Sequence, residues 1–133
     1  MKIMRYLVEE IKADIETVDE IGHKPIHFAA EYKNNVDVVR YLVEAHADVH
    51  ACILVSKWTA LHCAASAGRV DTIQYLLEET SLSVEDRSAT GQTPLHIAAM
   101  EVGKMDVVRY LVEKAKANVE ARTTTNETPL HYA

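Results

Sequence analysis

One seven-residue phrase occurs four times along the chain at a nearly constant interval. In chain order the copies are KPIHFAA from Lys24, TALHCAA from Thr59, TPLHIAA from Thr93 and a shortened TPLHYA from Thr128. The histidines of the four copies, 35, 34 and 35 residues apart, are His27, His62, His96 and His131. A fixed interval of this length is typical of stacked supersecondary units, each of which contacts only its neighbours.

A second phrase keeps the same interval. It reads MRYLVEE, VRYLVEA, IQYLLEE and VRYLVEK, with tyrosines at positions 6, 41, 75 and 110. Its apolar residues recur three and four positions apart, which predicts an amphipathic helix. The first phrase also predicts a helix, because a threonine suited to N-capping is followed in two copies by proline at the first helical position. Each unit is therefore expected to contain two short helices.

The glycines fall where turns are needed between these elements. Gly68, Gly103 or Asn34 is expected to end the first helix of a unit at positive φ. The chain after the second helix is expected to be extended and to reverse at a hairpin turn, where Gly22 and Gly91 stand. Lys57 occupies this position in one unit. Because positive φ is uncommon for lysine, we expect a turn of different shape there.

Helix, turn, helix and hairpin in about 33 residues, introduced by T-P-L-H-x-A, is similar to the ankyrin repeat. The resemblance covers essentially the whole chain. It implies an all-α fold, a solenoid of helix-turn-helix units with β-hairpin fingers along one edge, and a family role in binding proteins without catalysis. The expected single array, 1–133, divides into a partial repeat lacking its first helix (1–23), three repeats (24–58, 59–92 and 93–127) and the start of a truncated repeat (128–133).

The chain departs from the repeat pattern at several positions. Lys24 replaces the capping threonine, Ala60 replaces the proline, and Lys33 and Val102 are extra residues between paired helices. The two extra residues are expected to loosen local turns without breaking the stack. Both ends of the chain also fall inside a repeat. We expect the apolar edges left open there to allow self-association, unless the chain is a fragment of a longer array.

Composition argues against several classes of partner. Fourteen Lys and Arg against twenty Asp and Glu give a net charge of −6, which disfavours binding to nucleic acid. No apolar run approaches the roughly 20 residues needed to insert in a membrane. The two cysteines, Cys52 and Cys63, form no recognisable disulfide framework and fit a reducing compartment. The expected location is intracellular, in the cytoplasm.

The histidines and cysteines do not form a recognisable catalytic or metal site. The four repeat histidines are expected to link neighbouring units, and helices stacked roughly 8–10 Å apart hold them too far from one another to share a metal ion. His46 and His50 would need a continuous helix at a point where the helix is expected to end. His62 and Cys63 are adjacent and point apart on a helix, so they form no dyad. No cofactor, metal or enzymatic activity is expected.

The finger around residues 52–57 is the only apolar one, because it reads CILVSK where its counterparts read RSATGQ and RTTTNE. The apolar side chains could pack beneath Trp58 or form an exposed contact site. We expect at least two of Ile53, Leu54 and Val55 to be exposed. The predicted anchors for a partner are Ile53, Leu54, Val55, Trp58, Tyr32 and Met100. The predicted polar contacts are Glu20, His23, Arg87, Thr90 and Gln92.

These features favour a scaffold or adaptor that binds a protein through its fingers and the concave face of its first helices. The alternative is a structural spacer or regulatory segment of a larger protein whose active domain lies elsewhere. Neither hypothesis identifies the partner, because repeat scaffolds keep their framework and vary their surface.

Overall fold

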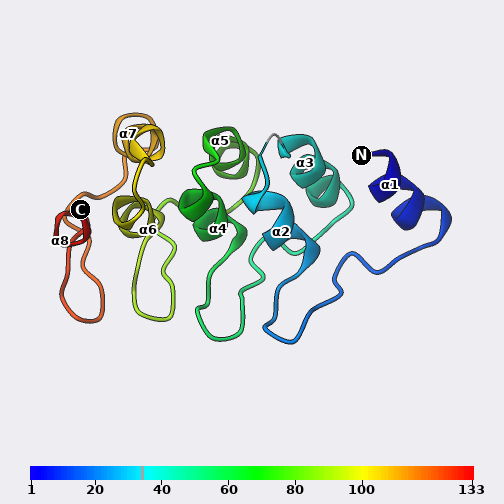
Figure 1. The fold of residues 1–133 in the computed structure, drawn as a ribbon, viewed down its shortest axis with the longest axis horizontal. Coiled ribbons are helices and arrows are strands. Elements are labelled where there is room, and N and C mark those ends of the chain that lie inside the picture. Colours follow the sequence, from blue (N-terminus) through cyan, green and yellow to red (C-terminus); the bar gives the residue numbers. More distant parts are fainter. Residues whose placement is uncertain (34) are drawn as a thin grey trace.

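A computed structural model describes residues 1–33 and 35–133 of the protein. Figure 1 shows pairs of short helices stacked in a single row, with long loops projecting to one side. The first helices of the units are α2 (Pro25–Glu31), α4 (Ala60–Ala67), α6 (Pro94–Met100) and α8 (Pro129–Tyr132). The second helices are α3 (Val36–Glu44), α5 (Val70–Glu79) and α7 (Met105–Glu113), preceded at the N-terminus by α1 (Lys2–Arg5) and the π-helical turn η1 (Tyr6–Glu10).

First helices pack on first helices and second helices on second helices, so the molecule consists of two parallel rows. The core lies between the rows. Its largest fully buried apolar side chains are Ile26, Leu42, Leu61, Ile73, Leu76, Ile97 and Leu111. The alanine pairs of the first phrase allow close approach, because Ala30, Ala64 and Ala65 are completely buried. The all-helical repeat solenoid expected from the sequence is confirmed.

The first helices begin as the phrase predicts. The Thr59 hydroxyl accepts a hydrogen bond from the Leu61 amide at 3.2 Å, and the Thr93 hydroxyl accepts one from the His96 amide at 3.4 Å. Lys24 has no oxygen that could accept such a bond. Its ammonium group instead forms an ion pair with Glu16, at 2.5 Å. The helix that starts after Lys24 therefore lacks a side-chain cap.

The two extra residues between paired helices shorten the first helices. α2 and α6 have seven residues each, whereas α4 has eight. Gly68 ends α4 at a φ of 79°, as predicted. α6 instead ends in extended backbone at Glu101, and Gly103 reaches its positive φ of 80° beyond the end of the helix. Asn34, the third residue predicted at such a turn, lies outside the described residues.

Some left-handed residues were not predicted from the glycines. Lys12, His46 and Lys116 have φ values of 61°, 69° and 57° and lie just beyond a second helix. Each allows the next amide to bond back to the helix; the Ala117 amide, for example, reaches the Leu111 carbonyl at 2.8 Å. Lysine and histidine therefore occupy positions that favour glycine.

The β-hairpin form of the fingers is not confirmed. The described residues contain no β-strand, and each finger is a loop whose turn is closed by two backbone hydrogen bonds, the outer of which is called here the closing bond. Adjacent fingers are also linked to one another. The Leu54 amide donates to the Ile21 carbonyl at 3.1 Å, Ala89 to Ser56 at 2.8 Å and Thr124 to Thr90 at 3.0 Å. These bonds hold the loops as a row.

The finger that contains Lys57 has a distinct turn, but not for the predicted reason. Lys57 does adopt positive φ, at 58°. The difference is one of length: the closing bond joins Ile53 to Trp58, five residues apart, whereas Ser88 bonds to Gln92 at a separation of four. The turn after the preceding helix α3 is correspondingly one residue shorter, because Ala47 bonds back five residues to Leu42, whereas Ala117 bonds back six residues to Leu111.

Candidate protein-binding surface

The first helices and the fingers form one continuous side of the molecule, called here the inner surface (α2, α4, α6 and the four fingers). Three large apolar side chains on its helices are exposed: Phe28, Tyr32 and Met100. Phe28 and Tyr32 line a groove of about 450 Å³ between α2 and α4, with Ser66 and Ala67 opposite them. An aromatic wall facing small side chains leaves room for a partner side chain.

A side-chain hydrogen bond fixes the two helix ends that border the groove. Arg69, which follows α4, donates from Nε to the Glu31 carbonyl at the end of α2, at 2.7 Å. This bond ties the two helix ends across the groove. Cys63 also lines the groove but is fully buried, and burial raises the pKa of its thiol well above its usual range. The thiol is therefore protonated and unreactive at neutral pH.

Phe28 was not predicted as a contact residue. It occupies the variable position of the first phrase, where Cys63 and Ile97 are completely buried, yet Phe28 is 40% exposed. Among residues 1–33 and 35–133, no first helix lies on the far side of α2 to cover it. Its ring packs against that of His23 instead, tilted by 34° with centroids 4.9 Å apart. The sequence feature that could have pointed to this contact residue is its type, since Phe28 is the only phenylalanine of the chain.

The apolar finger is divided between core and surface. Leu54 is 59% exposed and Val55 is 83% exposed, which confirms that at least two of the three aliphatic residues face solvent. Ile53 is only 6% exposed and belongs to the core, so its predicted role as a surface anchor is wrong. Ile53 starts the closed turn, at the position where Ser88 and Thr123 are also buried.

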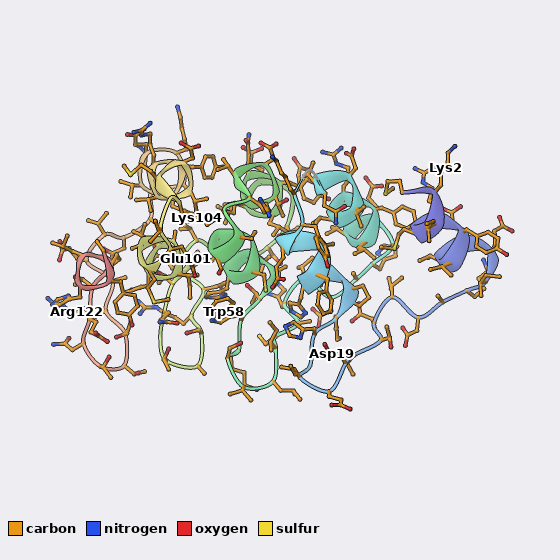
Figure 2. The ribbon with its side chains drawn as sticks, viewed as in Figure 1. Lys2, Asp19, Trp58, Glu101, Lys104 and Arg122 are labelled. Atoms are coloured by element: carbon orange, nitrogen blue, oxygen red, sulfur yellow. The ribbon has the colours of Figure 1, made fainter. Side chains whose placement is uncertain are left out.

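Trp58 is half-buried at the base of the same finger, beside the start of α4 (Figure 2). Its ring lies nearly parallel to that of His62, with an interplanar angle of 21° and centroids 6.3 Å apart. It packs against the core, so only part of the indole is available to a partner.

The predicted polar contacts of the third finger mainly hold the fingers together. Arg87 donates to the Gly91 carbonyl at 3.0 Å and to the Arg122 carbonyl of the next finger. The Gln92 side chain donates to the Tyr132 hydroxyl at 3.3 Å, and the Thr90 carbonyl accepts from the next finger. These side chains stabilise the row of fingers.

The predicted polar contacts of the first finger differ. Glu20 is exposed, and His23 is half-buried with its Nδ1 3.1 Å from the Asp19 carboxylate. The structure therefore gathers Glu20, His23, Tyr32, Leu54, Val55 and Trp58 around the first two fingers and α2. Arg87, Thr90 and Gln92 lie apart from them on the third finger, and Met100 lies at the end of α6.

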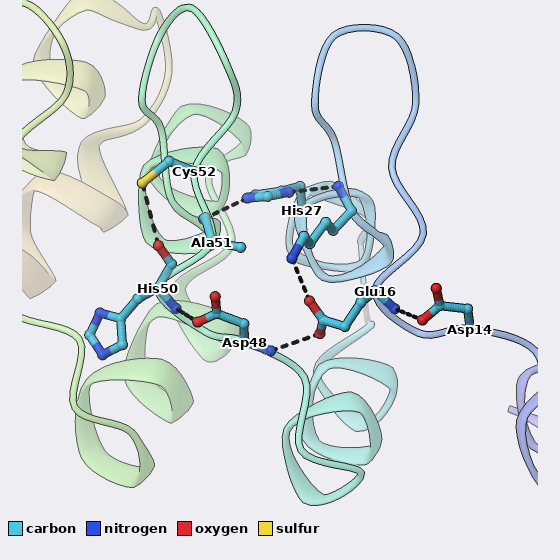
Figure 3. A network of polar contacts seen from close by, with 8 residues as sticks. Asp14, Glu16, His27, Asp48, His50, Ala51 and Cys52 are labelled. Carbon is cyan, nitrogen blue, oxygen red and sulfur yellow. Dashed lines mark hydrogen bonds and ion pairs between the residues drawn. The ribbon is translucent and has the colours of Figure 1, made fainter.

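The repeat histidines are structural links. His27 accepts from the Lys24 amide through Nδ1 at 2.9 Å and faces the Ala51 carbonyl through Nε2 at 2.9 Å (Figure 3). An amide can only donate and a carbonyl can only accept, so both bonds require the neutral ring with its proton on Nε2. His62 and His96 likewise accept at Nδ1 from the amides of their capping threonines, and their Nε2 atoms face the Gln92 and Glu127 carbonyls at the end of the finger that follows.

The remaining histidines of interest, His46 and His50, both lie beyond the end of α3. His46 has a left-handed backbone, and His50 Nε2 lies 2.6 Å from the Ser81 hydroxyl. Across residues 1–33 and 35–133, no group of three or more His, Cys, Asp or Glu side chains is arranged to hold a metal ion. In the same residues, no helix is long and apolar enough to cross a membrane.

Sequence comparisons agree with the repeated geometry. The model of the family described as "Ankyrin repeats (many copies)" matches residues 26–77, and that of "Ankyrin repeats (3 copies)" matches residues 79–133. The chain is similar to alpha-latrotoxin-Lg1a of Latrodectus geometricus, with 36% identity over 64% of this chain and 6% of the toxin.

The chain is also similar to short parts of two other proteins. A putative palmitoyltransferase, ZDHHC13 of Danio rerio, is 31% identical over 74% of this chain and 15% of its own length. The protein fem-1 homolog A-like of Mus musculus is 34% identical over 71% of this chain and 14% of its own length. The chain thus spans less than a sixth of each of these relatives.

Proposed function

Because the chain belongs to the ankyrin repeat family, we propose that it is a protein-binding scaffold that holds its partner on the inner surface. The observation that carries this proposal is the groove between α2 and α4, where Phe28 and Tyr32 expose aromatic surface that the fold does not use. Exposed aromatic side chains beside small residues are typical of contact sites between proteins.

The proposal assigns no catalytic role to the chain. Its support is that the nitrogens of His62 are committed to backbone partners, while the neighbouring Cys63 thiol is buried. An intracellular location is part of the same proposal, since both cysteines are free.

A structural or regulatory segment of a larger protein is the second candidate. It is favoured by the small share of each relative that the chain matches. In this case the inner surface would have no partner of its own, which makes the two candidates separable by experiment.

The test compares proteins captured from a lysate by three immobilised forms of the chain. In the first variant, Phe28→Ser and Tyr32→Ser remove the exposed aromatic wall. In the control, Val102→Ser and Met105→Ser remove exposed apolar side chains near the start of α7, outside the groove. The scaffold proposal expects specific proteins on the wild type and the control that are absent from the first variant. Identical captures by all three forms would overturn it.

A further inference from the structure

The tips of the first two fingers carry a joint apolar surface. It is defined as the tip patch and consists of Ile21, Leu54 and Val55, which are 57%, 59% and 83% exposed. The next two tips are polar or small, with Ala89 and Thr90 on one and Thr124 and Thr125 on the other. Apolar exposure at the tips is thus confined to one adjacent pair.

Backbone contacts hold the two parts of the tip patch together. The Leu54 amide donates to the Ile21 carbonyl at 3.1 Å, which fixes the register of the two tips. Leu54 also fills the space that a side chain on Gly22 would need, since a Cβ there would lie 2.6 Å from Leu54 Cγ. The leucine is therefore held against the first finger while much of its side chain faces solvent.

Opposite charges flank the tip patch. Glu20 precedes Ile21 on the first finger and Lys57 follows Val55 on the second, and both are exposed. Neither belongs to an ion pair among the residues that the structure describes. Asp19 differs, because its carboxylate accepts from the Ile21 and His23 amides of its own finger. Glu20 and Lys57 are thus the charges that a partner at the tips would meet.

We propose that the tip patch binds an extended segment of a partner protein with two bulky apolar side chains, a basic residue at the Glu20 end and an acidic residue at the Lys57 end. The two tips are joined by a backbone hydrogen bond, so a few residues of extended chain can contact both of them. This order of charges would fix the direction of the bound segment. The inference rests on the proposed scaffold function and specifies the chemistry of the partner.

The experiment selects random-sequence dodecapeptides, displayed on phage, for binding to the intact chain. The expected peptides carry two apolar residues between a basic and an acidic one. Leu54→Ser with Val55→Ser should weaken their binding about tenfold or more. Exchanging the flanking charges, by Glu20→Lys with Lys57→Glu, should select peptides with the reversed order of charges. The Val102→Ser and Met105→Ser control should bind as the wild type does.

Three results would overturn the tip-patch inference. They are the absence of enriched peptides, enriched peptides without this charge order, and undiminished binding to the Leu54→Ser, Val55→Ser variant. Peptides that are lost only with Phe28→Ser and Tyr32→Ser would refute the tip patch while leaving the scaffold function intact. Circular dichroism establishes that each variant is folded. If the double variant unfolds, Val55→Ser alone, at the most exposed of the three positions, replaces it.

Discussion

At the scale of single residues, the repeat histidines serve as both a cap and a link. Nδ1 accepts from the amide that precedes the first helix, and Nε2–H reaches a carbonyl of the finger that follows. A protonated ring would have a donor at both nitrogens and would lose the first of these bonds. A hydrogen-bonding role was expected from the family resemblance, whereas the capping role was not predicted. Only the structure identifies Ala51, Gln92 and Glu127 as the carbonyl partners.

Mild acid should destabilise the array through these histidines. Burial lowers the pKa values of His27 and His62 below the usual value near 6.5. Below about pH 6.5 the unfolded chain therefore binds more protons than the folded chain, and the free energy of unfolding falls as the pH decreases towards the folded pKa values. Urea unfolding at pH 7.5 and 5.5 measures this effect, and His62→Gln should reduce it. A stability that is unchanged or higher at pH 5.5 would contradict the prediction.

Lys116→Gly should stabilise the protein by about 0.5–1 kcal/mol, because the residue has a φ of 57° that strains a lysine more than a glycine. The matched control is Lys114→Gly, where the backbone is right-handed at a φ of −100°. There glycine relieves no strain and should lower stability by a similar amount. Thermal unfolding of both variants checks the prediction, and a lowered midpoint for Lys116→Gly would count against it.

At the scale of elements, the second finger shows where sequence reasoning stops. The distance from the repeat tyrosine to the next capping position is the same in each complete repeat, as from Tyr41 to Thr59. Within that distance the turn after α3 is one residue shorter and the finger is one residue longer. Together the two changes leave the number of residues between Tyr41 and Thr59 unchanged, so the spacing in the sequence could not reveal them. The apolar character of the finger was evident from the sequence, but the burial of Ile53 depended on this hidden shift.

The loss of the cap at Lys24 can be tested against the ion pair that replaces it. Lys24→Thr should add a cap that stabilises by about 0.5–2 kcal/mol. It also removes the contact with Glu16, which is worth about 0–1 kcal/mol at this partly exposed site. The net gain should therefore be smaller than in a Glu16→Gln background, where no ion pair is lost. Urea unfolding of the wild type, the two single variants and the double variant gives the coupling free energy between Lys24 and Glu16. An equal gain from Lys24→Thr in both backgrounds would show that the ion pair contributes nothing.

Along the row of second helices, arginine side chains lie over tyrosine rings of the next repeat, and one such pair is missing. Arg5 lies over the Tyr41 ring at 5.7 Å and Arg40 lies over Tyr75 at 5.2 Å, but Gln74 holds the equivalent position before Tyr110. Gln74→Arg should restore the contact and stabilise the α5–α7 joint by about 0.5–1 kcal/mol. Arg40→Gln is the reverse control and should destabilise by a similar amount. Melting midpoints that move together in the same direction would refute this account.

At the scale of the whole molecule, the repeated pattern accounts for the framework but not for the surface of each unit or its local stability, which should vary along the array. The repeat interval predicted the order of the helices and the location of the core, since both follow from a pattern that recurs in register. The exposure of surface side chains could not be predicted in the same way. Phe28 and Ile53 occupy positions whose counterparts are buried or polar, and their exposure depends on which neighbours the stack provides. A repeating pattern describes the average unit, whereas the surface depends on differences between units.

The N-terminal helices should therefore exchange their amide hydrogens faster than the central ones. α1 and η1 contain no buried residue, whereas α5 buries Thr72, Ile73 and Leu76. Few buried contacts mean a low free energy of local opening. Hydrogen exchange followed by mass spectrometry should show faster exchange in residues 2–10 than in residues 70–79 of a dilute sample.

The exposed Ile3 and Leu7 at one edge and Leu130 at the other also predict self-association. Protection of residues 2–10 should then increase with protein concentration. Equal protection of both segments in a strictly monomeric sample would show that the N-terminal helices are stable without a covering partner.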